Sequence, residues 1–145
     1  MAAGTSVKLV IPSELKLVDL VHAASERMAE LAGFDAEEAL NLGLAVREAV
    51  INAMLHGNKQ DLNLDVSVTL TSGAGGLEAV VKDQGNGFDP SQTPDPRVGA
   101  NLLRTTGRGL LLIQAFVDEL EIKKNKGGGA VVTMTKRLPS KDKTR

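Results

Sequence analysis

One stretch of the sequence carries three polar residues at intervals of four. On a helix, Glu48, Asn52 and His56 would lie along one stripe of an otherwise apolar surface. Such a helix is mostly buried, and buried polar side chains need partners. An Asn amide oxygen suits Mg²⁺, which takes few protein ligands, and a Glu one turn earlier could accept a proton from an attacking hydroxyl. An ordinary helix edge explains the stripe equally well, and for His56 we prefer a simple role in capping the helix end.

A second stretch places a carboxylate directly after a strand. The apolar positions from Leu77 to Val81 alternate, and Asp83 continues their parity, which predicts that it points inward. An inward carboxylate is costly unless it is hydrogen-bonded, and the exocyclic amine of adenine is a suitable donor. Gly85 and Gly87 allow the backbone to approach a ligand closely. The alternative is that the strand has already ended and that Asp83 caps a turn.

A third stretch is a glycine-rich turn in front of an apolar segment. Gly107 and Gly109 precede a helix expected from Leu110 to Phe116, and a turn of this kind aims backbone N–H groups at an anion. Arg108 could add a charged contact to a terminal phosphate. A tight turn with an exposed arginine is the alternative.

Thr133 is a weaker candidate on the last expected strand. Its hydroxyl could bond the edge of a base, whereas threonine in a strand often reflects β-propensity alone. The parity of this strand does not decide between the two.

The composition fits a soluble enzyme or switch better than a nucleic-acid-binding protein. The net charge of -1 leaves no basic footprint for DNA, RNA or an anionic membrane, and 2% aromatic residues give no stacking platform. The absence of cysteine excludes disulfides and thiolate sites. No P-loop, signal peptide or long apolar run is present, so we expect a cytoplasmic protein.

The 145 residues suggest a single domain, with its core at about 6–138 and a flexible tail at 139–145. We expect strands at 6–11, 64–70, 77–83, 120–124 and 130–138. A helix is expected after Ser13 as N-cap, and a second after Asp35 as N-cap to about His56, with Gly57 past its end. This order predicts an α+β fold with a mainly antiparallel sheet and helices on one face. The segment before Gly107 is long and contains Pro90, Pro94, Pro96 and Gly99, which suggests a lid.

Taken together, these stretches resemble the nucleotide-binding motifs of the GHKL superfamily. They are most similar to those of the anti-sigma factor and serine-protein kinase family of the general-stress and sporulation type. The residues that carry the resemblance are Arg47–Gly57, Val81–Pro90, Gly107–Glu119 and Gly128–Lys136. The resemblance covers 6–138. It implies a Bergerat-type two-layer α/β sandwich that binds ATP with Mg²⁺.

The resemblance also implies roles for individual residues. Asn52 would hold the metal and Glu48 would be the catalytic base, with Arg108 beside the transferred phosphate. Asp83 would bind the adenine amine. The other contacts to the cofactor would come from Gly85 and Gly87 at the base, Gly107, Gly109 and Leu110 at the phosphates beneath a lid from about 89 to 108, and Thr133 in support of the base.

In this family the acceptor is a serine of an anti-anti-sigma (STAS-type) protein, and the kinase otherwise holds a sigma factor. The resemblance therefore implies an anti-sigma regulatory factor with protein-serine kinase activity, often as a homodimer. A non-catalytic ATP-binding switch and a stand-alone histidine-kinase-like ATPase domain are the alternatives. The presence of Glu48 favours the kinase, since a pure binder needs no base.

Overall fold

The computed structural model describes residues 4–85, 107–125 and 127–139, and only the backbone of residues 107, 108 and 110. The predictions for Gly87, for most of the lid and for nearly all of the tail lie outside the described residues.

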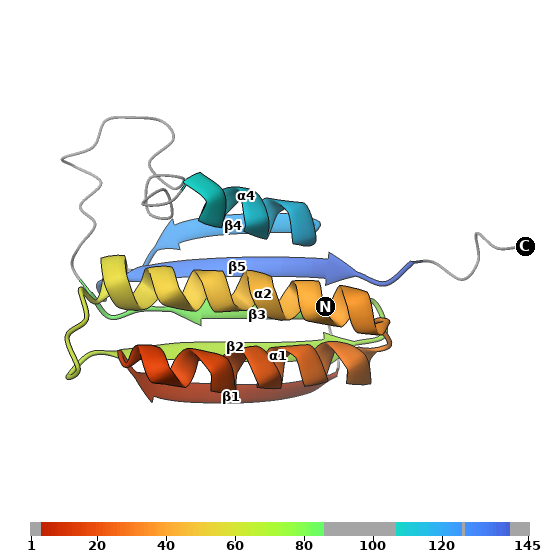
Figure 1. Ribbon diagram of the computed structural model, residues 1–145, viewed down its shortest axis with the longest axis horizontal. Coiled ribbons are helices and arrows are strands. Elements are labelled where there is room, and N and C mark those ends of the chain that lie inside the picture. Colours follow the sequence, from red (N-terminus) through yellow and green to blue (C-terminus); the bar gives the residue numbers. More distant parts are fainter. Residues whose placement is uncertain (1–3, 86–106, 126, 140–145) are drawn as a thin grey trace, which may run out of the picture.

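The fold has two layers, a five-stranded antiparallel sheet and a layer of helices on one of its faces (Figure 1). The sheet order is β1-β2-β3-β5-β4. The strands are β1 (Thr5–Pro12), β2 (Asp65–Gly73), β3 (Gly76–Lys82), β4 (Glu119–Lys124) and β5 (Ala130–Arg137). The α+β sandwich expected from the sequence is confirmed.

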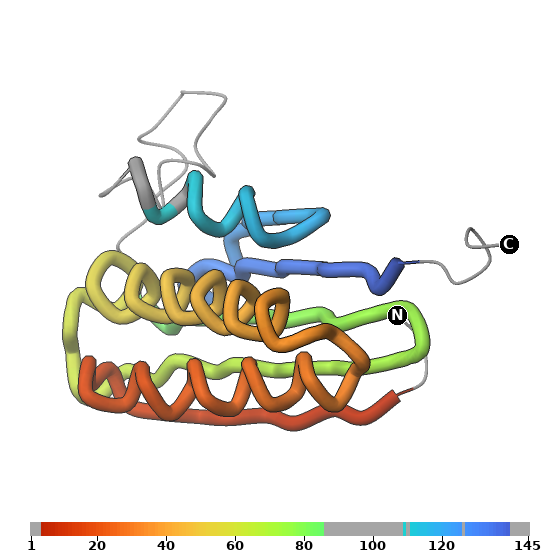
Figure 2. The backbone as a smooth tube through the Cα atoms, turned by 45° about the vertical axis from the view of Figure 1, so that its right-hand side comes forward, coloured from red at the N-terminus to blue at the C-terminus, as the bar shows by residue number. Residues whose placement is uncertain are grey.

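The helices are α1 (Val18–Ala32), α2 (Ala36–Asn52) and α4 (Gly107–Phe116), with a short 3-10 turn, Leu15–Leu17, before α1. In the turned view, α1 lies over β1 and β2, α2 over the middle of the sheet, and α4 over β4 (Figure 2). The α2 N-cap is Asp35, whose carboxylate accepts the Glu38 N–H at 2.8 Å, as the sequence predicted.

The hydrophobic core fills the space between the two layers. In β2 the buried side chains are Val66, Val68 and Leu70, and the intervening residues face the other side of the sheet. Helix α2 contributes the opposing surface, which includes Val46 and Val50. The core therefore lies on one face of the sheet, and the opposite face carries no helix among the described residues.

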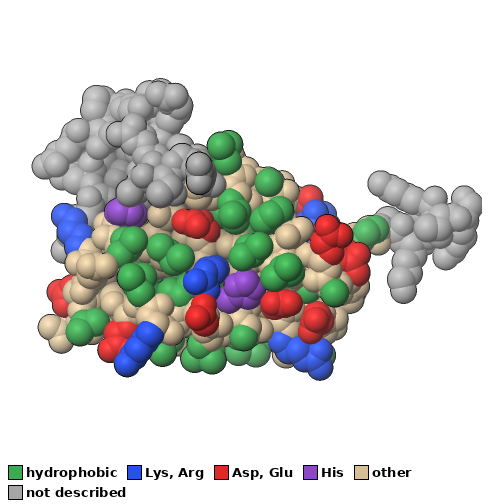
Figure 3. Space-filling model, in the orientation of Figure 1, with side chains coloured by type: hydrophobic (Ala, Val, Ile, Leu, Met, Phe, Trp, Pro, Cys, Tyr) green, Lys and Arg blue, Asp and Glu red, His purple; other side chains and the backbone are tan. Residues whose placement is uncertain are grey.

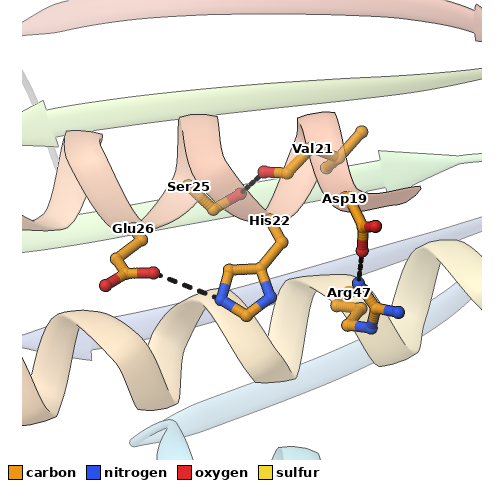
Figure 4. A network of polar contacts seen from close by, with 6 residues as sticks. All are labelled: Asp19, Val21, His22, Ser25, Glu26 and Arg47. Atoms are coloured by element: carbon orange, nitrogen blue, oxygen red, sulfur yellow. Dashed lines mark hydrogen bonds and ion pairs between the residues drawn. The ribbon is translucent and has the colours of Figure 1, made fainter. Parts of the chain in front are cut away.

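Helices α1 and α2 approach each other closely at Gly43. A Cβ at this position would lie 2.7 Å from Cδ2 of the His22 ring. The His22 ring forms a 3.3 Å contact with Glu26, and Arg47 pairs with Asp19 across the two helices (Figure 4). These contacts fix the position of α2, which carries Glu48 and Asn52.

Ser13 is not the helix cap that the sequence suggested. Its hydroxyl donates to the Leu64 carbonyl at 2.8 Å, and the chain enters α1 through the 3-10 turn instead. A long-range partner competes successfully for the serine because the segment before β2 runs beside it.

The surface over the helices mixes charge types. Acidic, basic and hydrophobic side chains are interspersed there, without a large area of one charge (Figure 3). None of the described helices is both long and apolar enough to cross a membrane.

Candidate functional site

Four chain segments meet at one end of the sheet. The end of α2, the end of β3, the start of β5 and the start of α4 all lie on the left in Figure 1. Three of the stretches singled out in the sequence therefore come together, although they are far apart along the chain.

Asp83 is the buried carboxylate at this end, with 7% of its surface exposed. Its Oδ1 accepts two hydrogen bonds of 3.1 Å, from the N–H groups of Gly85 and Ala130. Within the described part of the chain, Oδ2 accepts none. Burial raises the pKa of the Asp83 carboxyl, while the backbone hydrogen bonds from Ala130 and Gly85 act in the opposite direction. The predicted inward orientation is confirmed, and one carboxylate oxygen is left for a donor from outside the fold.

Glycines enclose this carboxylate. A Cβ on Gly57 would overlap the Asp83 carboxylate, and a Cβ on Gly85 would overlap the Gly57 carbonyl. Gly129 has φ of +87°, and a Cβ there would lie 2.8 Å from Asp83 Oδ1. The backbone of two other segments, at Gly57 and Gly129, therefore packs directly on Asp83, with no room for a side chain at either position.

Asn52 ends α2 and is also buried, at 4% exposure. Its Nδ2 is buried and has no hydrogen-bond partner among the described residues. A buried polar atom without a partner costs about 1–3 kcal/mol. A half-turn of the amide exchanges nitrogen and oxygen, so Asn52 can offer a donor or a ligand oxygen.

Glu48 lies one helical turn before Asn52 and is half-buried. Both residues belong to regular α-helix, so the predicted stripe holds for this pair. No group of three or more His, Cys, Asp or Glu side chains that could hold a metal occurs in the described ranges.

His56 leaves the stripe because the helix changes type after Asn52. Residues Ala53–Gly57 form a π-helix, in which Asn58 N donates to Ala53 O at 2.8 Å. A π segment alters the angular step between residues, so a spacing of four no longer aligns side chains. In the part of the chain described, the His56 side chain makes no hydrogen bond, so the expected capping is not observed.

The glycine stretch forms the first turn of α4 rather than a loop in front of it. The helix begins at Gly107, three residues before the predicted start, and Gly109 is buried. The first turn of a helix leaves N–H groups without partners inside the helix, which suits an anion. Arg108 and Leu110 belong to the same turn, but only their backbone is described.

Thr133 is not brought together with these residues. Its cross-strand neighbours are Val80 and Glu121, and it lines a hollow of about 390 Å³ on the helix-free face of the sheet. The inward-facing residues of β5 are Ala130, Val132 and Met134. The sheet separates Thr133 from Asp83, and we leave it out of the proposed site.

The fold is a two-layer sandwich that has, at one end, a buried carboxylate, a buried amide without a partner in the described ranges, and a helix N-terminus. This is the architecture of a nucleotide-binding domain that lacks a P-loop. The chain belongs to the histidine kinase-like ATPase domain family, whose profile matches residues 11–136.

The chain is also similar to proteins named serine-protein kinase RsbW. The Bacillus subtilis (strain 168) protein is 29% identical over 138 residues, which cover 91% of this chain and 85% of the relative. The Bacillus pumilus protein is 31% identical over 140 residues with the same coverage. The Listeria monocytogenes (strain EGD-e) protein is 28% identical over 134 residues, 88% of this chain and 85% of the relative. The family resemblance predicted from the motifs is confirmed.

Sequence reasoning missed several residues of the site. Gly57, Gly129 and Ala130 surround Asp83, and Asn58 holds the segment next to it. Gly57 was interpreted only as the end of a helix, and nothing in the spacing marks Asn58 as different from a loop residue.

Proposed function

We propose that this protein binds ATP at the end of the sheet described above and transfers its terminal phosphate to a serine of a partner protein. The observation that carries the proposal is Asp83, a buried carboxylate whose internal hydrogen bonds both go to Oδ1. Its Oδ2 would accept the exocyclic amine of adenine. Gly85 would lie at the base, together with Gly87 outside the described residues.

Asn52 would hold Mg²⁺. Its buried Nδ2 has no partner among the described residues, and a half-turn of the amide would present Oδ1 there to a hard cation. Bound Mg²⁺ would neutralise charge on the phosphates. Asn52 would thus fix the cation, and through it the phosphates, at the end of α2.

The phosphates would lie at the start of α4. The backbone N–H groups of Gly107, Gly109 and Leu110 belong to the first turn of a ten-residue helix. Arg108 would add a positive charge at the terminal phosphate.

Glu48 would act as the catalytic base. It would accept the proton of the attacking serine hydroxyl, while the serine oxygen bonds to the γ-phosphorus. The bond from that phosphorus to the β–γ bridging oxygen breaks, and ADP leaves. A base in this position distinguishes a kinase from a switch that only binds ATP.

The relatives described above are named serine-protein kinases, which supports a protein acceptor. We propose that the acceptor is a STAS-type anti-anti-sigma protein and that the kinase otherwise binds a sigma factor in the cytoplasm as a homodimer. Phosphorylation of the acceptor would leave the kinase free to hold the sigma factor.

The test mixes purified protein, γ-labelled ATP and candidate STAS-type acceptors. Glu48→Gln should lower phosphoryl transfer by about 10²–10⁴-fold with ATP affinity nearly unchanged. Glu37→Gln, an exposed position on the same helix, is the matched control and should transfer phosphate normally. ATP binding without any labelled acceptor would reject the kinase and leave a non-catalytic switch. Failure to bind ATP would reject the pocket.

A further inference from the structure

Asn58 is a buried polar residue that uses every hydrogen-bonding group of its side chain. It directly follows the π-helix and is 2% exposed. Its Nδ2 donates to Ser13 Oγ at 2.9 Å and to the Asp65 carbonyl at 3.0 Å. Its Oδ1 accepts the backbone N–H of Gln84 at 2.8 Å. One side chain therefore joins the end of β1, the start of β2 and the turn after β3.

The backbone on the C-terminal side of Asn58 needs such support. Lys59 and Gln60 both have positive φ, of 53° and 61°, which non-glycine residues rarely adopt. The chain also turns sharply here, since Asp61 N donates to the Asn58 carbonyl at 3.0 Å. The buried amide anchors the segment at the point where it reverses.

The bond to Gln84 acts on Asp83. The Gln84 N–H belongs to the peptide group that links Asp83 to Gln84, and the Asp83 N–H donates to Ala130 O at 3.1 Å. Both peptide groups that flank the Asp83 Cα are thus held in place. Gln84 closes the network, because its Oε1 accepts the Asp65 N–H at 2.6 Å.

Both Nδ2 hydrogens of Asn58 are used within the fold and its Oδ1 accepts from Gln84, so Asn58 would act on a ligand through the peptide next to Asp83. We infer that Asn58 is a positioning residue that aims the Asp83 carboxylate, and so sets the preference of the pocket for adenine over a purine without the amine. This inference rests on the proposed ATP site.

Without Asn58 the Gln84 N–H loses its acceptor, and the peptide after Asp83 can rotate. A hydrogen bond to a carboxylate depends strongly on its angle, so the contact with the adenine amine weakens. A purine diphosphate with a carbonyl oxygen at this position, inosine diphosphate, gains nothing from Asp83 and loses little.

The experiment measures the affinities of the full chain for ADP and for inosine diphosphate by titration calorimetry. Wild type should prefer ADP. Asn58→Ala should reduce the ratio of ADP affinity to inosine diphosphate affinity by about tenfold, because the ADP affinity falls. Ser13→Ala is the matched control: it removes a partner from the other end of Asn58 and leaves the Gln84 bond intact, so its preference should equal that of wild type.

A purely structural role for Asn58 would lower both affinities together and keep their ratio, and that result would overturn the inference. A wild type that binds neither nucleotide, or binds both equally, would reject the proposed adenine site itself. If Asn58→Ala does not fold, as judged by circular dichroism, Asn58→Ser serves instead, because its hydroxyl is too short to reach Gln84. If Asn58→Ser then prefers ADP over inosine diphosphate as strongly as wild type does, the inference is overturned.

Discussion

The Cα of Gly57 lies directly against the carboxylate of Asp83, so that a Cβ at position 57 would lie 2.8 Å from Oδ1 and overlap Oδ2. The end of a helix and the end of a strand thus meet without an intervening side chain. This contact places the end of the π-helix that follows α2 beside the buried acid.

Gly57→Ala should push Asp83 out of place and lower ADP affinity by about tenfold or more. Overpacking a close contact costs about 1–3 kcal/mol, and 1.4 kcal/mol is a factor of ten in affinity. Alanine is a better helix former than glycine, so poor helix formation cannot explain such a loss. Titration calorimetry measures the effect. Gly75→Ala, where a Cβ meets nothing within 4 Å, is the control. Equal affinities in both variants would contradict the packing argument.

Asp83→Asn should weaken ADP binding by about 1–3 kcal/mol and leave the fold intact. The Asn oxygen can still accept from Gly85 and Ala130, but its NH₂ group then faces the adenine amine, donor against donor. Fluorescent-nucleotide displacement gives the affinity, and circular dichroism checks the fold. Wild-type affinity in the variant would show that Asp83 does not recognise the base.

The raised pKa of Asp83 predicts a specific pH dependence of stability. The pKa of Asp83 in the folded protein lies above its ordinary value of 3.8. The stability that the protonated carboxyl contributes is therefore fully present below pH 3.8. It is lost as the pH rises through the folded-state pKa. Asp83→Asn does not titrate, so its unfolding temperature relative to wild type should increase from about pH 4 upward. Thermal unfolding at a series of pH values measures this difference.

Asp19 provides a control of opposite sign. The hydrogen bond and charge of Arg47 lower its pKa (Figure 4), so its contribution is present above pH 3.8 and lost as the pH falls. The unfolding temperature of Asp19→Asn, relative to wild type, should therefore decrease as the pH rises. If the unfolding temperatures of both variants, relative to wild type, changed in the same direction with pH, the two pKa shifts would be contradicted.

Gly43→Ala should lower the free energy of unfolding by about 1–3 kcal/mol without changing ADP affinity. The added methyl meets the His22 ring at 2.7 and 2.8 Å, between α1 and α2 and away from Asp83. Denaturant unfolding measures the loss. Combining it with His22→Ala should cost less than the sum of the single changes, because the ring is then absent. Strict additivity would show that the two residues do not clash.

The strands and helices were predictable because their patterns are local. The alternation before Asp83 and the cap at Asp35 each depend on neighbouring residues, and both predictions are confirmed. Ser13 was predicted wrongly because its hydroxyl binds the distant Leu64 carbonyl instead of the next helix. The π-helix after Asn52 was also missed, since no pattern in the sequence distinguishes it from α-helix.

The site was predictable in its chemistry but only partly in its construction. Residue type and parity identified Asp83, and helical spacing paired Glu48 with Asn52. The parity of the strand that carries Thr133 was ambiguous in the sequence, and only the burial of Val132 and Met134 shows that Thr133 lies on the helix-free face.

The sequence by itself determined the order of the elements, the inward direction of Asp83 and the family, because these depend on periodicity and on motifs in a fixed order. Only the tertiary structure decided what surrounds the carboxylate. Gly57, Asn58, Gly129 and Ala130 reach Asp83 from two other segments. Contacts of this kind come from the packing of distant backbone, which leaves no periodic trace in the sequence.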